Sequence, residues 1–293
     1  MSRPRASRSA SASLASLASL HLLPAVAATE LPTVASINLC TDQLVLSVAA
    51  PEQILSLSWL AADPEESMRA DAARAYPLNA GSAEELIEIG ADVVIAGTQT
   101  SPFTRQLLRR LGARVVEIEA ENSIADIRRN LLAVGAAIDR TEQATGRVRE
   151  IDLRIAAIQS RRDTEGQRDS EGQRDSERPR SAVVVRPGGF TIGRETLAFE
   201  LLMLAGLTNS VADLDRWGSL SVETLLHAQP TYVVLTSYRT GEASLANAFF
   251  EHPALASRAA GQETLVVAAR YFACGAPESL AAAEILLAQM GAP

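Results

Sequence analysis

Apolar and polar positions along the chain alternate in short blocks that predict strands and helices in turn. Short apolar runs predict strands at 34–39, 54–58, 93–96, 115–118, 182–185 and 265–268. Amphipathic stretches predict helices at 42–48, 102–111, 196–204 and 277–290. Strands that alternate with helices favour an α/β fold with largely parallel sheets of the doubly wound type.

One helix–strand pattern occurs twice. Residues 82–95 and 221–234 align without a gap at a constant offset of 139 positions. In each copy a serine N-cap opens an amphipathic helix that runs into a short buried strand. A repeat this far apart is unlike a solenoid, whose units recur every 20–50 residues or so. It predicts two similar βα lobes in one chain.

A different pattern separates the two lobes. Apolar residues recur in steps of three and four from Ile124 to Ile158, and Thr141 and Thr145 keep the phase in the middle. This predicts one amphipathic helix about 55 Å long that joins the lobes. A duplicated polar segment follows at 163–177, with no apolar side chain to bury, and predicts an exposed loop.

The first residues are typical of an export signal. Three arginines precede an apolar run at 14–23, and Ala27 and Ala28 offer small residues for cleavage. We therefore expect a signal peptide at 1–28, an N-terminal lobe at 33–121, a connecting helix at 122–160, a low-complexity loop at 161–180 and a C-terminal lobe at 181–293. A formal net charge of −8 makes an exported nucleic-acid-binding protein a poor fit.

Candidate ligand residues follow the predicted strands, because ligands of open parallel sheets bind at the carboxyl ends of the strands. Aromatic residues make up only 4% of the chain, yet several lie in or beside these loops. They are Trp59, Phe190, Trp217, Tyr238, Tyr271 and Phe272. Such a set favours a large, partly apolar ligand, although a single loop aromatic is more often a plug for the local core. Arg239 and Arg270 suit an anionic ligand or, equally, surface ion pairs.

Evidence for catalysis or for a bound metal ion is thin. After the leader only His227 and His252 remain, and neither has a partner at a familiar metal-ligand spacing. The chain lacks a phosphate-binding glycine loop and a nucleophile elbow. Cys40 and Cys274 are the only cysteines, and an exported compartment permits either a disulfide or two separate thiols.

Together, the export signal, two βα lobes, a long connecting helix and a Ser-x-Glu helix in each lobe resemble the helical-backbone (class III) periplasmic binding proteins of ABC importers. This group carries iron-siderophores, haem and cobalamin. In the family, one glutamate on each lobe meets the two permease subunits, and the matching positions are Glu84 and Glu223. The alternative is that both carboxylates only stabilise their own helices, through a favourable interaction with the helix dipole in the first turn.

The resemblance implies a periplasmic, monomeric, non-enzymatic protein that delivers a small-molecule metal chelate to a permease dimer in the inner membrane, without a cofactor of its own. Its cleft residues would be Trp59, Thr98, Gln99 and Thr100 from one lobe, and Phe190, Trp217, Tyr238, Arg239, Arg270 and Tyr271 from the other. A ferric-siderophore ranks first as cargo and cobalamin second, while haem would need Tyr238 or Tyr271 as an axial ligand. An exported enzyme that uses a cleft carboxylate such as Asp42, or a ligand sensor, remains an alternative.

Overall fold

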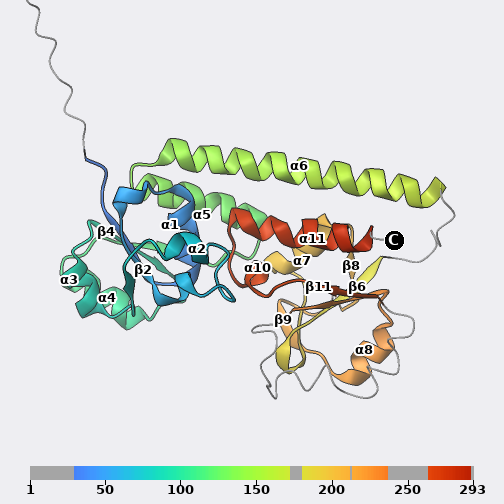
Figure 1. The fold of residues 1–293 in the computed structure, drawn as a ribbon. Helices are drawn as coiled ribbons and strands as arrows, with labels where there is room; N and C mark the ends of the chain where they lie inside the picture. Colours follow the sequence, from blue (N-terminus) through green and yellow to red (C-terminus); the bar gives the residue numbers. More distant parts are fainter. Residues whose placement is uncertain (1–29, 172–179, 212, 237–262, 292–293) are drawn as a thin grey trace, which may run out of the picture. The chain divides into compact units, whose positions relative to one another are not determined.

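In a computed structural model, the first half of the chain folds around five parallel strands in the order β3-β2-β1-β4-β5 (Figure 1). The strands are β1 (Val34–Ser36), β2 (Ile54–Ser58), β3 (Leu78–Asn79), β4 (Val93–Gly97) and β5 (Val115–Ile118). The helices among them are α1 (Leu39–Val48), α2 (Ala70–Ala73), α3 (Ala83–Ile89) and α4 (Pro102–Arg110), with short 3-10 turns η1 (Pro51–Gln53) and η2 (Trp59–Ala62).

The structure describes residues 30–171, 180–211, 213–236 and 263–291. Within them, Leu31 onward belongs to a single compact unit. The predicted signal peptide, and the predicted ligand residues Tyr238 and Arg239, lie outside the described residues. No helix in the described ranges is both long and apolar enough to span a bilayer.

The second half of the chain folds around four parallel strands in the order β11-β10-β6-β8. The strands are β6 (Ser181–Val185), β8 (Thr208–Asn209), β10 (Tyr232–Leu235) and β11 (Glu263–Val266), beside an antiparallel hairpin of β7 (Phe190–Ile192) and β9 (Trp217–Ser219). The helices are η3 (Pro187–Gly189), α7 (Leu197–Leu204), α8 (Val222–Ala228), α10 (Arg270–Ala273), η6 (Pro277–Leu280) and α11 (Ala281–Met290).

Both sheets share one topology. In the first, β1 lies between β2 and β4, with β5 outside β4; in the second, β6 lies between β8 and β10, with β11 outside β10. The repeated sequence pattern corresponds to α3 with β4 and to α8 with β10. The predicted fold class, two similar βα lobes with parallel sheets, is therefore confirmed.

The sheets are buried on both faces, as parallel sheets usually are. One face of each strand faces a continuous core that includes Val34, Leu131, Ile151, Val184 and Leu286. The opposite faces pack in separate clusters, one under α3 and α4 and the other under α8. The continuous core runs through the connecting helices, so the first sheet, those helices and the helices of the second sheet share buried surface.

The prediction of one connecting helix is wrong. Two helices, α5 (Ile124–Ala137) and α6 (Thr141–Glu171), pack side by side as an antiparallel hairpin (Figure 1). The Arg128 guanidinium bonds to the Asp152 carboxylate across it, at 2.6 Å. Asp139 adopts a left-handed conformation with φ 56°, and the Arg140 N–H donates to the Gly135 carbonyl at 2.7 Å. This Schellman-type ending stops α5 although the apolar period continues in phase.

Helix α6 also continues into the segment 161–171, which was expected to belong to the low-complexity loop. The described part of the polar duplication is helical, because α6 continues through Glu171. The Arg161 side chain pairs with Glu165 one turn on, at 2.7 Å, and such pairs support an exposed polar helix. Residues 172–179 lie outside the described part.

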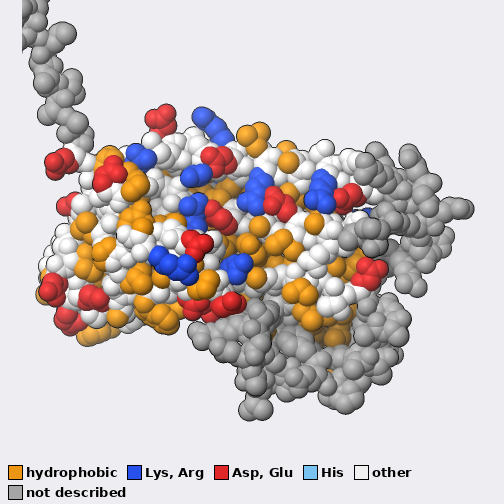
Figure 2. Space-filling view, in the orientation of Figure 1, with side chains coloured by type: hydrophobic (Ala, Val, Ile, Leu, Met, Phe, Trp, Pro, Cys, Tyr) orange, Lys and Arg blue, Asp and Glu red, His pale blue; other side chains and the backbone are white. Residues whose placement is uncertain are grey.

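Charged pairs connect α6 to its neighbours. Arg154 forms two hydrogen bonds with the Glu284 carboxylate of α11, at 2.5 and 2.7 Å, and donates to the Pro277 carbonyl. Figure 2 shows arginine and acidic side chains interspersed on the face where α6 and α11 lie. The helix that follows the first lobe is thereby tied to the last helix of the second.

Candidate functional site

A cavity of about 330 Å³ lies at the carboxyl edge of the first sheet, and residues of the second lobe form its opposite wall. From the first lobe it is lined by Asn38, Cys40, Thr41, Gly97, Thr98, Gln99, Ile118, Glu119, Ala120, Glu121 and Asn122. From the second it is lined by Thr196, Leu197, Ala198, Arg216, Trp217, Phe272 and Ala273. The loops after β1 and β4 meet at the point where the strand order reverses, which is where open parallel sheets bind ligands.

Asn38 organises the first-lobe wall. Its Oδ1 caps α1 by accepting the Thr41 N–H at 3.0 Å, and its Nδ2 donates to Thr100 Oγ1 at 3.2 Å. The cap satisfies a backbone donor at the start of the helix, and the second bond joins the loop after β1 to the loop after β4. Thr98 and Gln99 are exposed between these anchors, so their side chains present hydroxyl and amide groups.

Trp217 provides the flat surface of the second-lobe wall. It opens β9, is 48% exposed, and has the Arg186 guanidinium carbon 4.9 Å from its ring centroid. A guanidinium is attracted to the face of an indole ring, and this attraction helps to hold the Trp217 ring in place. The adjacent Arg216 lies 3.6 Å from the Glu195 carboxylate. The wall therefore combines an aromatic face with a partly neutralised cation.

Glu121 is the most buried carboxyl in the cavity wall. Asn130 Nδ2 donates to its Oε1 at 2.9 Å and also to the Glu119 carbonyl at 2.7 Å. Burial raises the pKa of Glu121, and the nearby Asp126 adds to the rise, while hydrogen bonds from Asn130 and from the Gly275 backbone oppose it. The cavity thus contains a carboxyl held in a partly desolvated position.

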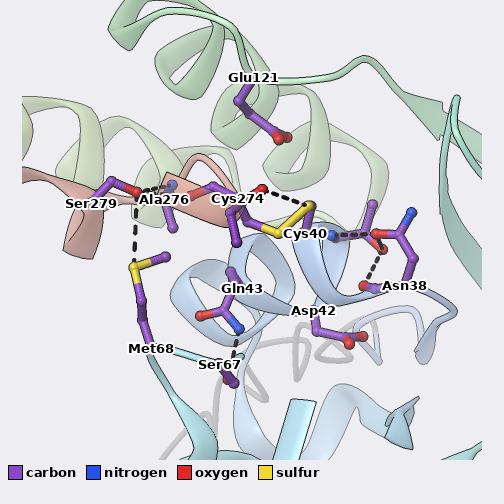
Figure 3. The surroundings of a disulfide bond; sticks show 12 residues. Asn38, Cys40, Asp42, Gln43, Ser67, Met68, Glu121, Cys274, Ala276 and Ser279 are labelled. Carbon is purple, nitrogen blue, oxygen red and sulfur yellow. Dashed lines mark hydrogen bonds between the residues drawn. A yellow bond between two sulfur atoms is a disulfide. The ribbon is translucent and has the colours of Figure 1, made fainter. Parts of the chain in front are cut away.

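A disulfide between Cys40 and Cys274 joins the lobes at the cavity, with the two Cα atoms 5.0 Å apart (Figure 3). The Ser279 hydroxyl donates to the Cys274 carbonyl at 2.9 Å and accepts the Ala276 N–H at 3.1 Å. In Figure 3 the Glu121 carboxyl points toward the region of the disulfide. The disulfide and Glu121 belong to the same part of the cavity wall.

A sequence model of the periplasmic binding protein family matches residues 34–270. The chain belongs to this family. It is similar in fold to the heme-binding protein RhuT from Roseiflexus sp. RS-1, with 17% identity, 88% of this chain and 98% of that one covered, and a TM-score of 0.69. It is also similar to the vitamin B12-binding protein BtuF of Vibrio cholerae, with 15% identity, 89% and 96% covered, and a TM-score of 0.63.

A third similar structure is that of an Fe3+-hydroxamate transport system from Saccharomonospora viridis, with 20% identity, 89% and 94% covered, and a TM-score of 0.63. A search of curated protein sequences gives no significant match. The predicted family, the helical-backbone periplasmic binding proteins, is confirmed. The family is extracytoplasmic, and a small-molecule ligand and a permease partner are implied by it.

Some residues predicted for the cleft of this periplasmic binding protein line the cavity and others do not. Thr98, Gln99 and Trp217 line it, and Thr100 lies beside it, bonded to Asn38. Trp59 is 57% exposed at the end of β2, away from the β1–β4 junction. Phe190 is 54% exposed, with its ring over Gly188.

Arg270 and Tyr271 lie in a second cavity of about 470 Å³, together with residues of the segment 64–72 and Glu278. The Arg270 guanidinium is 5.2 Å from the centroid of the Tyr271 ring and donates to the Pro64 carbonyl at 3.0 Å. Arg69 pairs with Glu278 at 2.5 Å in the same wall. Because α10 turns the chain just before Cys274, these side chains and the disulfide line different cavities.

Asp42 does not line the cavity between the loops after β1 and β4. It is fully buried, and Ser58 donates to its carboxyl through its N–H at 3.1 Å and its hydroxyl at 2.5 Å. Burial raises the pKa of Asp42 to about 7, although these hydrogen bonds oppose the rise. The expectation of a cleft carboxylate at Asp42 is wrong, because the side chain is turned toward the end of β2.

The two helices of the repeat begin as predicted. Ser82 Oγ accepts the Glu85 N–H at 3.2 Å, and Ser221 Oγ accepts the Thr224 N–H at 3.1 Å. The Glu85 carboxylate accepts the Ala80 N–H at 2.8 Å. Glu84 and Glu223 are both exposed in the first turn.

Sequence reasoning missed the polar residues Glu119, Glu121, Asn122, Thr196 and Arg216. The first three follow β5, so the rule that ligands bind at strand ends would have found them. Arg216 precedes a two-stranded hairpin that the sequence did not predict, and no local signal identifies it. Among the described residues, no three His, Cys, Asp or Glu side chains are grouped closely enough to hold a metal ion.

Proposed function

We propose that this chain is the substrate-binding protein of an ABC importer, that it captures a bulky metal chelate in the cavity between its lobes, and that it performs no catalysis. The observation that carries the proposal is the cavity at the carboxyl edge of the first sheet, which is lined by Trp217 from the second lobe and by Thr98 and Gln99 from the first. An aromatic face opposite a few convergent polar groups suits a large ligand with an apolar body and a polar rim.

A ferric-siderophore is the first candidate cargo. The cavity wall offers amide and hydroxyl groups, a cation at Arg216 and an indole face, which fit the carbonyl-rich and partly apolar surface of such a chelate. Cobalamin is the second candidate, because Trp217 and the amide groups also suit a corrin ring and its amide side chains. Haem is a third candidate, for which the axial ligand would be Tyr271, which lines the second cavity, or Tyr238, which lies outside the described residues.

The test is a fluorescence titration of the mature protein with a ferric hydroxamate, a ferric catecholate, haem and cobalamin. We expect saturable quenching by one class, corrected for inner-filter absorption. Trp217→Phe should remove most of the quenching, whereas Trp59→Phe should retain it, because only Trp217 lines the cavity. Equilibrium dialysis of both variants separates lost signal from lost binding.

Four outcomes would count against the proposal. If none of the four ligands changed the fluorescence or was retained in dialysis, the cargo would not be a chelate of these classes. If Trp59→Phe abolished the response while Trp217→Phe preserved it, the ligand site would be elsewhere. Turnover of any bound ligand would favour the exported-enzyme alternative, while binding without transport would favour a sensor.

Docking to the permease dimer is proposed for Glu84 and Glu223. The repeat gives each lobe one exposed carboxylate in the first turn of a serine-capped helix. We expect Glu84→Ala with Glu223→Ala to abolish uptake of the ligand by cells and leave its affinity unchanged. Glu142→Ala, on the exposed first turn of α6, is the matched control. Surviving uptake, or a loss of affinity, would refute the docking role.

We propose that export to the periplasm depends on residues 1–28, with cleavage near Ala27 or Ala28. We also propose that the mature protein is a monomer. N-terminal sequencing of the exported protein tests the cleavage site. Light scattering during gel filtration tests the monomer.

A further inference from the structure

The charges around the ligand cavity are not equally balanced. Glu119 pairs with Arg129 at 3.3 Å, and Arg216 lies 3.6 Å from Glu195. Glu121 has no ion pair within the described part of the chain, and the charged group that acts on it most closely is another carboxylate, Asp126. A carboxyl in the cavity wall is therefore left without a compensating cation.

The position of Glu121 is fixed from both lobes. Asn130, itself only 3% exposed, holds the carboxyl from α5 by one hydrogen bond. On the other side Gly275 packs so closely that a Cβ there would lie 2.2 Å from the Glu121 Cβ. An ionised carboxylate can accept about four hydrogen bonds, so the three donors on Asn130, on Gly275 and on its own backbone do not exhaust its capacity.

We propose that Glu121 determines ligand specificity: it accepts a hydrogen bond from a donor group on the rim of the captured chelate and disfavours chelates whose rim is anionic. This inference rests on the proposed chelate-binding function. A carboxylate built into a rigid wall disfavours ligands that leave one of its acceptor positions unfilled, because an unfilled acceptor position away from water costs free energy. The strongest partner would be an ammonium group, since charge-assisted hydrogen bonds are about twice as strong as neutral ones.

Glu121 should favour trihydroxamates that carry an ammonium group over catecholates. A ferric trihydroxamate that carries a free ammonium group presents a donor and a positive charge to Glu121. A ferric tris-catecholate is strongly anionic and would face an unpaired carboxyl with only the partly neutralised Arg216 to offset it. We therefore expect trihydroxamates of the first kind to bind more tightly than catecholates.

Binding of the ammonium ligand should also depend on pH. Because burial and Asp126 raise the pKa of Glu121, the carboxyl ionises at a higher pH than an exposed glutamate. The other groups near Glu121 are the Asn130 amide, the Gly275 N–H and Arg216, which lines the same cavity from the second lobe. Glu119 also lines the cavity, and its carboxylate pairs with Arg129. Affinity for an ammonium ligand should rise as Glu121 deprotonates, and affinity for its uncharged counterpart should change less.

The experiment compares two ferric trihydroxamates that differ only in a free or an N-acetylated ammonium group, together with a ferric tris-catecholate and cobalamin. Wild type should prefer the free ammonium by about tenfold, which corresponds to about 1.4 kcal/mol. Glu121→Gln, which keeps the shape and one donor contact, should reduce that preference to about unity and remove its pH dependence. Glu142→Gln, exposed on α6, should leave both unchanged.

The outcomes separate the two proposals. If wild type binds none of the four probes, the chelate-binding function fails. If wild type binds any probe and Glu121→Gln binds it with the same affinity and the same preference, the function stands and the role of Glu121 is overturned. Circular dichroism and thermal melting of Glu121→Gln confirm that it folds before either conclusion is drawn.

Discussion

Asp42 shows how a polar residue near a ligand site can serve the fold instead. Its side chain leaves the first turn of α1 and meets the end of β2, where Ser58 donates two hydrogen bonds to it. A carboxyl with a pKa of about 7 is protonated over much of the acidic range. The folded chain therefore favours the neutral carboxyl, because the cost of burying the charge exceeds what the Ser58 hydrogen bonds offset.

This predicts a pH-dependent contribution to stability. The pKa of Asp42 is about 7 in the folded chain against 3.8 for an unperturbed aspartate, so its stabilisation is complete below pH 4 and is lost as the pH rises to 7. As the pH rises over that range, the unfolding free energy of wild type should fall by up to about 4 kcal/mol relative to that of Asp42→Asn, which has no carboxyl to ionise. Urea unfolding at several pH values measures it, and a difference that stayed constant would contradict the assignment.

Gly275 is the residue at which the second lobe approaches Glu121 most closely. An added Cβ would lie 2.2 Å from the Glu121 Cβ and 2.9 Å from Ile127 Cγ1, so the neighbouring segments must move apart. We expect Gly275→Ala to lower the unfolding free energy by about 1–3 kcal/mol. Gly146→Ala, on α6 with open space around it, should instead raise it by about 0.5–1 kcal/mol. Chemical denaturation of both variants tests the contrast.

The site could be predicted from the sequence only where a strand end is recognisable. Thr98 and Gln99 follow β4 directly, and the strand-end rule locates them. The same rule selects Trp59, which follows β2 but does not line the cavity, and it does not select Trp217, which opens a hairpin strand that the sequence did not predict. Glu121 acquires its environment from Gly275, which lies far along the chain, and no local pattern reports that contact.

Among the elements, the strands of both sheets other than β3 and β8 were the easiest to predict. Each is a short apolar run bounded by polar residues, and parallel strands buried on both faces need such runs. Short strands such as β3 and β8, and the hairpin of β7 and β9, have no such signal. Their position depends on pairing with neighbours, and sequence periodicity does not contain that information.

The break between α5 and α6 has a local cause that apolar periodicity cannot reveal. Asp139 adopts a left-handed conformation, which is costly for a residue with a side chain, and its environment is exposed. Asp139→Gly should therefore stabilise the protein by about 0.5–1 kcal/mol. Arg149→Gly, at an exposed position inside α6, should destabilise it by about 1 kcal/mol. If both substitutions destabilised equally, the Schellman ending would not be what separates the helices.

At the scale of the whole molecule, several interactions hold the two lobes at the ligand cavity. The disulfide is covalent, and the Ile124 N–H donates to the Glu200 carboxylate at 2.7 Å. Arg69 with Glu278, and Arg154 with Glu284, add ion pairs between segments that are distant in sequence. The walls of the cavity are thus fixed relative to each other before ligand arrives, which lowers the ordering cost of binding.

Removal of the disulfide should weaken both the fold and the site. Cys40→Ser with Cys274→Ser is expected to lower the unfolding free energy by about 2–5 kcal/mol, because a long covalent loop in the unfolded chain is lost. Ligand affinity should fall as well, since both cysteines belong to the segments that line the cavity. Denaturation and dialysis measure the two effects, and the double variant avoids a free thiol. Unchanged values in both would mean that the other contacts suffice.

The sequence separation of 234 residues between Cys40 and Cys274 also bears on how the protein is made. Cys274 follows the last strand, so the covalent loop encloses every described strand except β1. An exported chain that emerges amino end first presents Cys40 early and its partner only near the end of synthesis. Until then Cys40 is a lone thiol in an oxidising compartment, open to mispairing with other chains. Biogenesis of this binding protein should therefore depend on how quickly translocation finishes.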